Sequence, residues 1–245
     1  MIRILKNLFL IHKKYPFFII TSIIAIIANI LGMMMYKGHV EIFSSFDNPS
    51  LAFWNQSGMY FTLLFFPVTL SIIISISIFN SKQNKGFYIE RLAPISPLKM
   101  IGGRVIYFIL LNIVTMFSFL MSFYLISYIM NVKIVSPFLY VYWSAMGIIG
   151  LLPLIGLQII FSLLFNNKSI PILLSIIGSL ANFLLMKTPV SWLDPYALMS
   201  LGMRTQQLTI MTMYEWLSFI IINSLYIILF ITVSARILKM KLYSI

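Results

Sequence analysis

The chain has very little charge for its size: only 9% of its 245 residues are Asp, Glu, Lys or Arg, whereas 61% are hydrophobic. Soluble domains carry roughly 25% charged residues, because their surfaces face water. This sequence cannot cover a globule with polar side chains, which excludes a soluble enzyme or a soluble binding module. Lipid is therefore the expected solvent.

Three further absences narrow the function. Cysteine is missing, which excludes disulfides and thiolate-bound metals and leaves the redox compartment undetermined. A phosphate-binding GxxxxGK[ST] loop is missing too, so any energy from ATP must come from another chain. The long apolar runs contain no ionisable residue. Ion-coupled transporters and intramembrane proteases need such residues at membrane depth, so neither class fits.

Six apolar runs are candidate membrane-spanning helices, since about 20 apolar residues cross a bilayer. They cover residues 17–36, 58–79, 105–130, 138–165, 170–186 and 216–235. The fifth is short, and the third and fourth are long, so tilt or an interfacial end is expected there. Pro67 and Pro153 are expected to kink the second and fourth spans. We predict an all-α integral membrane protein with one domain over residues 1–245.

The basic residues predict the orientation. Six spans place both termini on one side, which carries one acidic residue, Glu90, and thirteen basic residues: Arg3, Lys6, Lys13, Lys14, Lys82, Lys85, Arg91, Lys99, Arg104, Lys168, Arg236, Lys239 and Lys241. The other side balances Lys37, Lys133, Lys187 and Arg204 against Glu41, Asp47, Asp194 and Glu215, so the net charge of +12 lies on one face. By the positive-inside rule both termini are cytoplasmic. Charge spread over separate loops argues against nucleic-acid binding.

Residues 1–16 have an amphipathic pattern. Arg3, Lys6, Asn7, Lys13 and Lys14 share one helical face, and Ile4, Leu5, Leu8 and Ile11 lie largely opposite. We predict an interfacial helix along the inner leaflet, turned into the first span near Pro16. The alternative is a basic topology signal without a defined conformation.

Small and weakly polar side chains recur inside the spans. Those that could line a path for an amphipathic solute are Ser71, Ser75, Asn112, Thr115, Ser175, Ser179 and Asn182. The alternative, favoured for most of them, is helix packing, in which hydroxyls bond across helices and small residues let backbones approach. The spacing of Gly147, Gly150 and Gly156 in the fourth span suits the same alternative.

The segment 80–104 is the longest loop on the predicted cytoplasmic side. Ser96 is a good N-cap and Pro97 suits the first helical position, while Gly102 and Gly103 suit a helix stop. We predict a helix of one to two turns that offers Leu98 as an apolar contact. The alternative is a tight turn into the third span.

Residues 90–104, ERLAPISPLKMIGGR, resemble the loop before the third span of type-2 ABC transporter permeases, which reads roughly E-x-L…P-[IV]-S-x-x-x-[LI]-x-x-G-K. Arg104 replaces the usual Lys. The resemblance implies a coupling helix in a groove of a partner ATPase, formed by Glu90, Pro94, Ser96, Pro97, Leu98, Lys99, Gly103 and Arg104. It implies a non-catalytic membrane subunit without cofactor or metal of its own, paired with a second permease chain and with an ATPase dimer that binds ATP and Mg²⁺.

Residues 192–204, WLDPYALMSLGMR, lie where type-2 permeases carry a proline-led extracellular helical hairpin. Asp194-Pro195 can start a helix and Gly202 can end it, while Trp192 and Tyr196 suit the membrane interface. The candidate residues for an extracellular gate are Trp192, Pro195, Tyr196, Met199 and Met203; a lipid-anchoring loop is the alternative.

Length and these two segments look most like the small permeases of lantibiotic-immunity and peptide-export systems of Gram-positive bacteria. This resemblance implies a plasma-membrane exporter that moves an amphipathic, bacteriocin-like peptide outward. A lipid or drug exporter, a non-transporting membrane scaffold and a channel stay open as alternatives.

Overall fold

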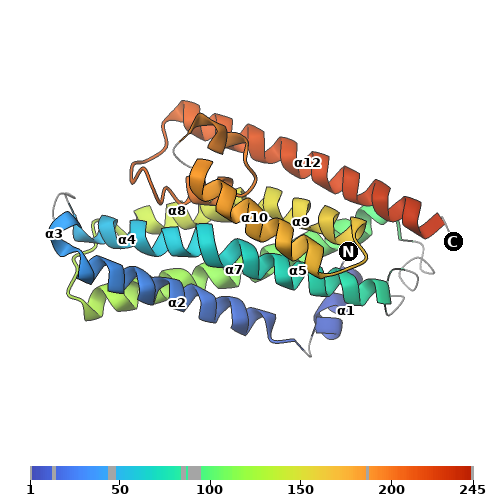
Figure 1. Ribbon diagram of the computed structural model, residues 1–245, viewed down its shortest axis with the longest axis horizontal. Helices are drawn as coiled ribbons and strands as arrows, with labels where there is room; N and C mark the ends of the chain where they lie inside the picture. Colours follow the sequence, from blue (N-terminus) through green and yellow to red (C-terminus); the bar gives the residue numbers. More distant parts are fainter. Residues whose placement is uncertain are drawn as a thin grey trace.

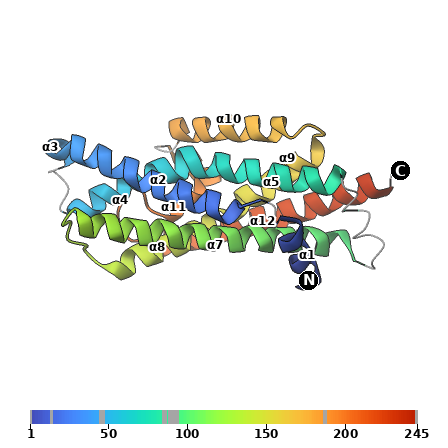
Figure 2. The same ribbon diagram turned by 90° about the horizontal axis from the view of Figure 1, so that it is seen from below.

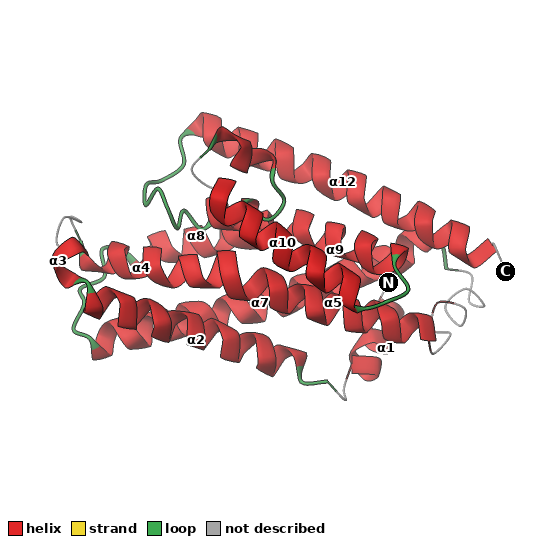
Figure 3. Ribbon diagram, viewed as in Figure 1, coloured by secondary structure: helices red, strands yellow, loops and turns green. Residues whose placement is uncertain are grey.

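The computed structural model describes residues 2–12, 15–43, 48–83, 87, 95–185 and 188–243. Within these residues every regular element is a helix (Figure 3). The elements are α1 (Ile2–His12), α2 (Phe17–Gly38), α3 (Val40–Phe43), α4 (Pro49–Met59), the π-helix η1 (Tyr60–Phe65), α5 (Phe66–Gln83), α7 (Pro97–Ile129), α8 (Pro137–Gly150), α9 (Leu152–Leu164), α10 (Ser169–Leu185), the 3₁₀-helix η2 (Pro189–Leu193), α11 (Leu198–Gly202) and α12 (Met213–Tyr243).

The long helices lie side by side, and both chain ends are at the same end of the bundle (Figures 1 and 2). Five helical runs in the described residues are long and apolar enough to cross a membrane: Phe17–Gly38, Pro49–Gln83, Pro97–Ile129, Pro137–Leu164 and Met213–Lys241. They correspond to five of the six predicted spans. The remaining one, 170–186, matches α10, which has only 17 residues. That length gives about 25 Å, less than the roughly 30 Å of a hydrocarbon core.

Both prolines expected to disturb a span lie beside an interruption of the regular α-helix. The π-helix η1 directly precedes the turn that contains Pro67. Leu151 separates α8 from α9, whose second residue is Pro153. Proline has no N–H to donate to the carbonyl four residues earlier, so the ladder is broken at each site.

The predicted helix stop at Gly102-Gly103 is wrong, because both residues lie inside α7, which has 33 residues in all and ends at Ile129. Tertiary packing explains why. A Cβ at Gly103 would lie 2.7 Å from Cγ2 of Ile4, so glycine is what lets α1 cross closely over α7. That packing outweighs the helix penalty of glycine, about 1 kcal/mol. The predicted one- to two-turn helix is thus the first part of the third span.

The N-terminal segment forms the helix α1, and it docks on the start of α7. Its buried stripe is Ile4, Leu8 and His12, whereas Lys6 and Asn7 are exposed. The His12 ring lies 4.9 Å from the ring of Tyr107, between ring centroids. The side of α1 predicted to face lipid is therefore partly used for packing within the chain.

An aromatic cluster fills the other end of the bundle, between α4, α7 and α8. The ring of the fully buried Trp54 has its centroid 5.5 Å from that of Phe119, 5.1 Å from that of Phe123 and 5.0 Å from that of Tyr140. The hydroxyls of Ser50 and Tyr140 are 2.7 Å apart and share a hydrogen bond. This rigid wall is the surface against which the chain between α10 and α12 folds.

Candidate functional site

Residues 188–212, called the hairpin below, contain η2 and α11 and pack against the bundle. Its α11 lies directly on α8. A Cβ at Gly150 would lie 2.2 Å from the carbonyl oxygen of Leu198, and a Cβ at Gly202 would lie 2.5 Å from that of Met146. Backbone meets backbone here, so the glycines of the fourth span serve packing, as the packing alternative predicts.

Two side chains of α4 hold the far end of α11. The indole N–H of Trp54 donates to the carbonyl oxygen of Met203 over 3.0 Å. The side-chain amide of Asn55 donates to the carbonyl oxygen of Thr205. Because α4 belongs to the second helical run of the bundle, the hairpin is fixed between that run and the fourth one.

The hairpin is also tied to the start of α12. Thr212 and Glu215 form a reciprocal capping box, in which Glu215 Oε2 accepts from the Thr212 N–H at 2.9 Å and the Glu215 N–H donates to Thr212 Oγ1 at 3.3 Å. Arg204 is only 3% exposed, and its Nη1 lies 3.3 Å from Glu215 Oε1. Sequence reasoning counted these two charges only for topology; the T-x-x-E pattern could have located the helix start.

A buried polar network joins the hairpin to the middle of the bundle. Ser71 Oγ donates to Gln158 Oε1 at 2.9 Å, and Gln158 Nε2 donates to the phenol oxygen of Tyr196 at 2.8 Å. Asn182 Nδ2 donates to the Tyr196 carbonyl oxygen at 3.0 Å. Burial raises the pKa of Tyr196 to about 12, so its phenol stays protonated. Gln158, the centre of this network, was not among the predicted site residues.

Of four other predicted path residues, three lie on α5 and α10 beside this network and one lies on α7. Ser175 donates to the Pro67 carbonyl oxygen at 3.2 Å, and Ser75 shares a 3.3 Å hydrogen bond with Ser162. Ser179 is buried on the same face of α10. Thr115 instead lies on α7 and donates to Thr21 of α2 at 2.7 Å.

Asn112 also lies on α7, fully buried, and neither amide atom has a hydrogen-bond partner among the described residues. The predicted path therefore divides into two groups, one around α5, α9 and α10 and one between α2 and α7. The hydroxyls of Ser71, Ser75, Ser175 and Thr115 bond across helices, which is the arrangement that the packing alternative predicts, whereas the Ser179 hydroxyl has no hydrogen-bond partner among the described residues.

The predicted gate residues are mostly inside the chain. Tyr196, Met199 and Met203 are buried, while Trp192 and Pro195 are half-buried. The Tyr196 side chain is turned into the protein, where its phenol oxygen accepts from Gln158 Nε2.

The helix of the hairpin ends at Gly202 as predicted, but it starts at Leu198 and not at Asp194-Pro195. Asp194 instead closes a turn, with its Oδ1 accepting from the Tyr196 N–H at 3.0 Å. An Asp side chain that accepts a hydrogen bond from the backbone N–H two residues later favours a turn over a helix.

The predicted coupling residues divide into an outer and an inner set. Glu90 and Pro94 lie outside the described residues. Ser96 caps α7, with its Oγ accepting from the Lys99 N–H at 3.4 Å. Leu98 is 52% exposed, and Ser96 and Lys99 are exposed beside it.

Gly103 and Arg104 point inward, toward this chain. Arg104 is 1% exposed and donates through Nη1 to the Met100 carbonyl oxygen at 3.0 Å. Its guanidinium carbon lies 4.2 Å from the ring centre of Phe87, a cation–π contact. The outer face of the first turn of α7 is thus backed by a packed inner face.

At the same end, two lysines cap the C-terminus of α9. Lys82 Nζ donates to the carbonyl oxygens of Ser162, Leu163 and Phe165 at 2.7, 2.9 and 2.7 Å. Lys241 Nζ donates to that of Leu163 at 2.6 Å. Cations at a helix C-terminus satisfy unpaired carbonyls and oppose the helix dipole. Sequence reasoning counted both lysines only as topological charges.

Residues 4–182 match the family model described as "ABC-2 family transporter protein". The match covers α1 to α10, including the start of α7 and the polar network as far as Asn182, and it ends before the hairpin and α12. No curated protein and no solved structure matches the chain.

Proposed function

The chain belongs to the ABC-2 transporter family, and from this we propose that it is the membrane-spanning subunit of an ATP-driven exporter. The chain would contribute no catalytic group. ATP and Mg²⁺ would be bound by a dimer of partner ATPase chains, and a second permease chain, identical or not, would complete the transporter.

In this proposal the chain crosses the plasma membrane six times, with α10 as the short fifth crossing. α10 leads from the end that holds both termini toward the opposite end, alongside α5 (Figures 1 and 2). Lys82, Lys99, Arg236, Lys239 and Lys241 all belong to helix ends on the side of the termini. The positive-inside rule then places that end in the cytoplasm.

The observation that carries the proposal is the start of α7. It presents Leu98 and Lys99 on a capped helical turn whose reverse side is packed against α1 and Phe87. A partner that pushes on this turn therefore pushes on a rigid assembly at the head of a 33-residue helix. An apolar side chain next to a cation suits a groove with an apolar floor and an acidic rim.

For the cargo we favour an amphipathic, bacteriocin-like peptide that is moved outward for immunity or export. The support is the likeness to small lantibiotic-immunity permeases and the absence of fixed charge at membrane depth. The hairpin would then act as the extracellular gate, since it packs on α8 and α4 away from the coupling turn.

A lipid-like cargo is the second candidate, favoured by a groove on the outer wall between α2 and α7. The groove has a volume of about 470 Å³ and is lined by Ile26, Ile30, Phe117, Ser118, Met121, Ser122, Leu125 and Ile126. Six apolar side chains with two hydroxyls suit an alkyl chain better than a folded peptide.

The test replaces Leu98 by Asp. An unpaired carboxylate in an apolar contact costs several kcal/mol, against about 8 kcal/mol for a micromolar complex, so most of the ATPase should be lost. The matched control is Val135→Asp, which changes a side chain with 50% exposure in the connection between α7 and α8 at the other end.

Both variants should insert normally, because each position is exposed. Copurification of the ATPase and peptide resistance are measured for wild type, Leu98→Asp and Val135→Asp. Loss in Leu98→Asp alone supports the coupling role. Full activity and a retained partner in Leu98→Asp would show that this turn does not contact an ATPase.

A further inference from the structure

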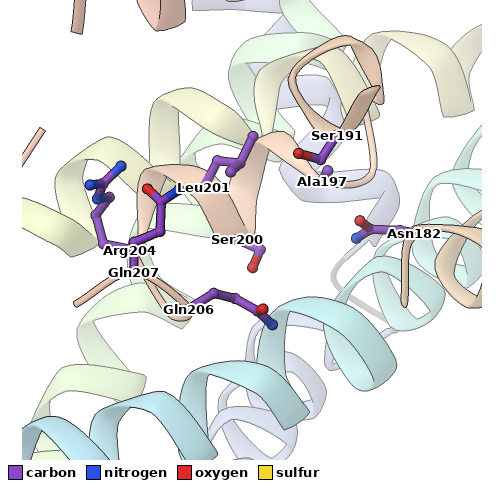
Figure 4. Close-up of a pocket in the computed structure, with 8 residues that line it drawn as sticks. All are labelled: Asn182, Ser191, Ala197, Ser200, Leu201, Arg204, Gln206 and Gln207. Carbon is purple, nitrogen blue, oxygen red and sulfur yellow. The ribbon is translucent and has the colours of Figure 1, made fainter. Parts of the chain in front are cut away.

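A small, partly open cavity lies between the end of α10 and the hairpin. Figure 4 shows its lining residues: Asn182, Ser191, Ala197, Ser200, Leu201, Arg204, Gln206 and Gln207. Its volume is about 30 Å³, which is enough for one or two water molecules. Six of the eight lining residues are polar.

One acceptor in this cavity has no partner. Asn182 is fully buried, and its Nδ2 is committed to the carbonyl oxygen of Tyr196. Because a carbonyl can only accept, this bond fixes which way the amide is turned. Asn182 Oδ1 then has no hydrogen-bond partner among the described residues, and Figure 4 shows the amide directed toward the hairpin residues of the lining. A buried acceptor without a hydrogen bond lowers the stability of the folded chain, so we expect a donor beside Asn182 Oδ1.

The lining decides what the donor is. Arg204 is engaged outside the cavity, with Nε and Nη2 donating to Thr209 and Nη1 paired with Glu215, so no free positive charge attracts an anion. The lining contains no carboxylate, so a desolvated cation would not be compensated. The volume excludes a larger neutral group. A water molecule meets all three conditions.

We propose that an ordered water bridges Asn182 Oδ1 on α10 to the hydroxyls of Ser191 and Ser200 on the hairpin. The Ser191 hydroxyl already donates to the Thr188 carbonyl oxygen at 2.8 Å, and the Ser200 hydroxyl is paired with Thr205 Oγ1 at 2.7 Å. The water then donates to Asn182 Oδ1 and to Ser191 Oγ, and it accepts from the Ser200 hydroxyl when Thr205 Oγ1 donates to Ser200 Oγ. The water thus has the two to four polar partners that a buried site requires.

The consequence is an asymmetric hairpin. Its α8 side is dry, with backbone atoms in direct contact at Gly150 and Gly202. Its α10 side combines direct contacts of Tyr196, with Asn182 Nδ2 and with Gly178, and the proposed water.

The direct test is a map of the full chain in lipid nanodiscs at about 2 Å resolution. Density for a water 2.7–3.2 Å from Asn182 Oδ1 is expected in wild type and absent in Asn182→Leu. A dry cavity around a well-resolved Asn182, or density for a larger group, would overturn the proposal.

A second test uses Ala197→Val, which fills the cavity. It should lower the melting temperature of wild type, because the displaced water leaves Asn182 Oδ1 unpaired. It should not do so in an Asn182→Leu background, and Asn112→Leu, a change at a buried asparagine of α7, serves as the control background in which the loss persists. Equal losses in all three backgrounds would refute the water. Neither test involves an ATPase or transport, so failure here leaves the proposed function standing.

Discussion

Replacing Gly150 by alanine should unseat the hairpin from α8. The added Cβ would lie 2.2 Å from the carbonyl oxygen of Leu198 and 3.0 Å from Cα of Met199, and both are backbone atoms. Ordinary contact begins at 3.4 Å, so α11 must withdraw by about 1 Å. A flexible side chain could turn away, but here the whole short helix has to move.

The expected cost follows from two opposing effects. Overpacking against a fixed neighbour costs about 1–3 kcal/mol, and exchanging glycine for alanine within a helix returns at most about 1 kcal/mol. The return is small at Gly150, which is the last residue of α8. A net loss of about 1–2 kcal/mol corresponds to a roughly 5- to 30-fold rise in the population with a displaced hairpin.

The assay exploits the absence of cysteine from the chain. A single Met199→Cys, at a position that is 1% exposed, reports displacement through its rate of reaction with a membrane-impermeant maleimide. Gly150→Ala should raise that rate and lower the melting temperature. Gly38→Ala is the matched control, since Gly38 also ends a helix but has open space around its missing Cβ. Unchanged labelling and melting in Gly150→Ala would refute the backbone contact between α8 and α11.

Two further predictions concern the end of the bundle that holds the termini. Burial, with a smaller contribution from the Arg104 charge, lowers the pKa of His12 from 6.5 to about 4. The unfolded chain therefore binds a proton below about pH 6.5 while the folded chain does not until about pH 4, so stability present at pH 7 should fall by up to about 3 kcal/mol on acidification. Between pH 7.5 and 4.5 the melting temperature should depend less on pH in His12→Phe than in wild type. An identical pH dependence in both proteins would contradict the burial of His12. Lys82→Met removes three charged hydrogen bonds from the end of α9 and should cost about 1–3 kcal/mol; a melting temperature equal to that of wild type would show that this cap does not stabilise the helix.

Local sequence rules located the features that depend on local chemistry. Apolar runs gave five helices long enough to span, and the Ser96-Pro97 pair marked the first turn of α7. Gly202 marked the end of α11. Each of these follows from properties of neighbouring residues: side-chain hydropathy, a capping hydroxyl, or a residue with no Cβ.

The errors came from partners that are distant in sequence. Gly103 suits a helix stop by itself, but Ile4 packs against it from α1 and the helix continues. Asp194-Pro195 suits a helix start by itself, but α11 begins only at Leu198, after Tyr196 has bonded to Gln158 and Asn182. In both cases the residue type allows two environments, and a contact from another helix selects one. Hydropathy carries no information about such contacts.

Hydrogen bonds connect α9 both to the end of the bundle that holds the termini and to the hairpin. Lys82 lies at the end of α5, close to the coupling residues that are predicted to meet an ATPase. This lysine caps the C-terminus of α9. One turn and a half earlier in the chain, Gln158 binds both Ser71 of α5 and Tyr196 of the hairpin. A displacement of α5 relative to α9 would therefore strain the Tyr196 contact. If motion at the coupling turn reaches the hairpin through packed contacts, the pair α5 and α9 supplies the short route, because both of its ends are fixed by hydrogen bonds and not by apolar contact alone.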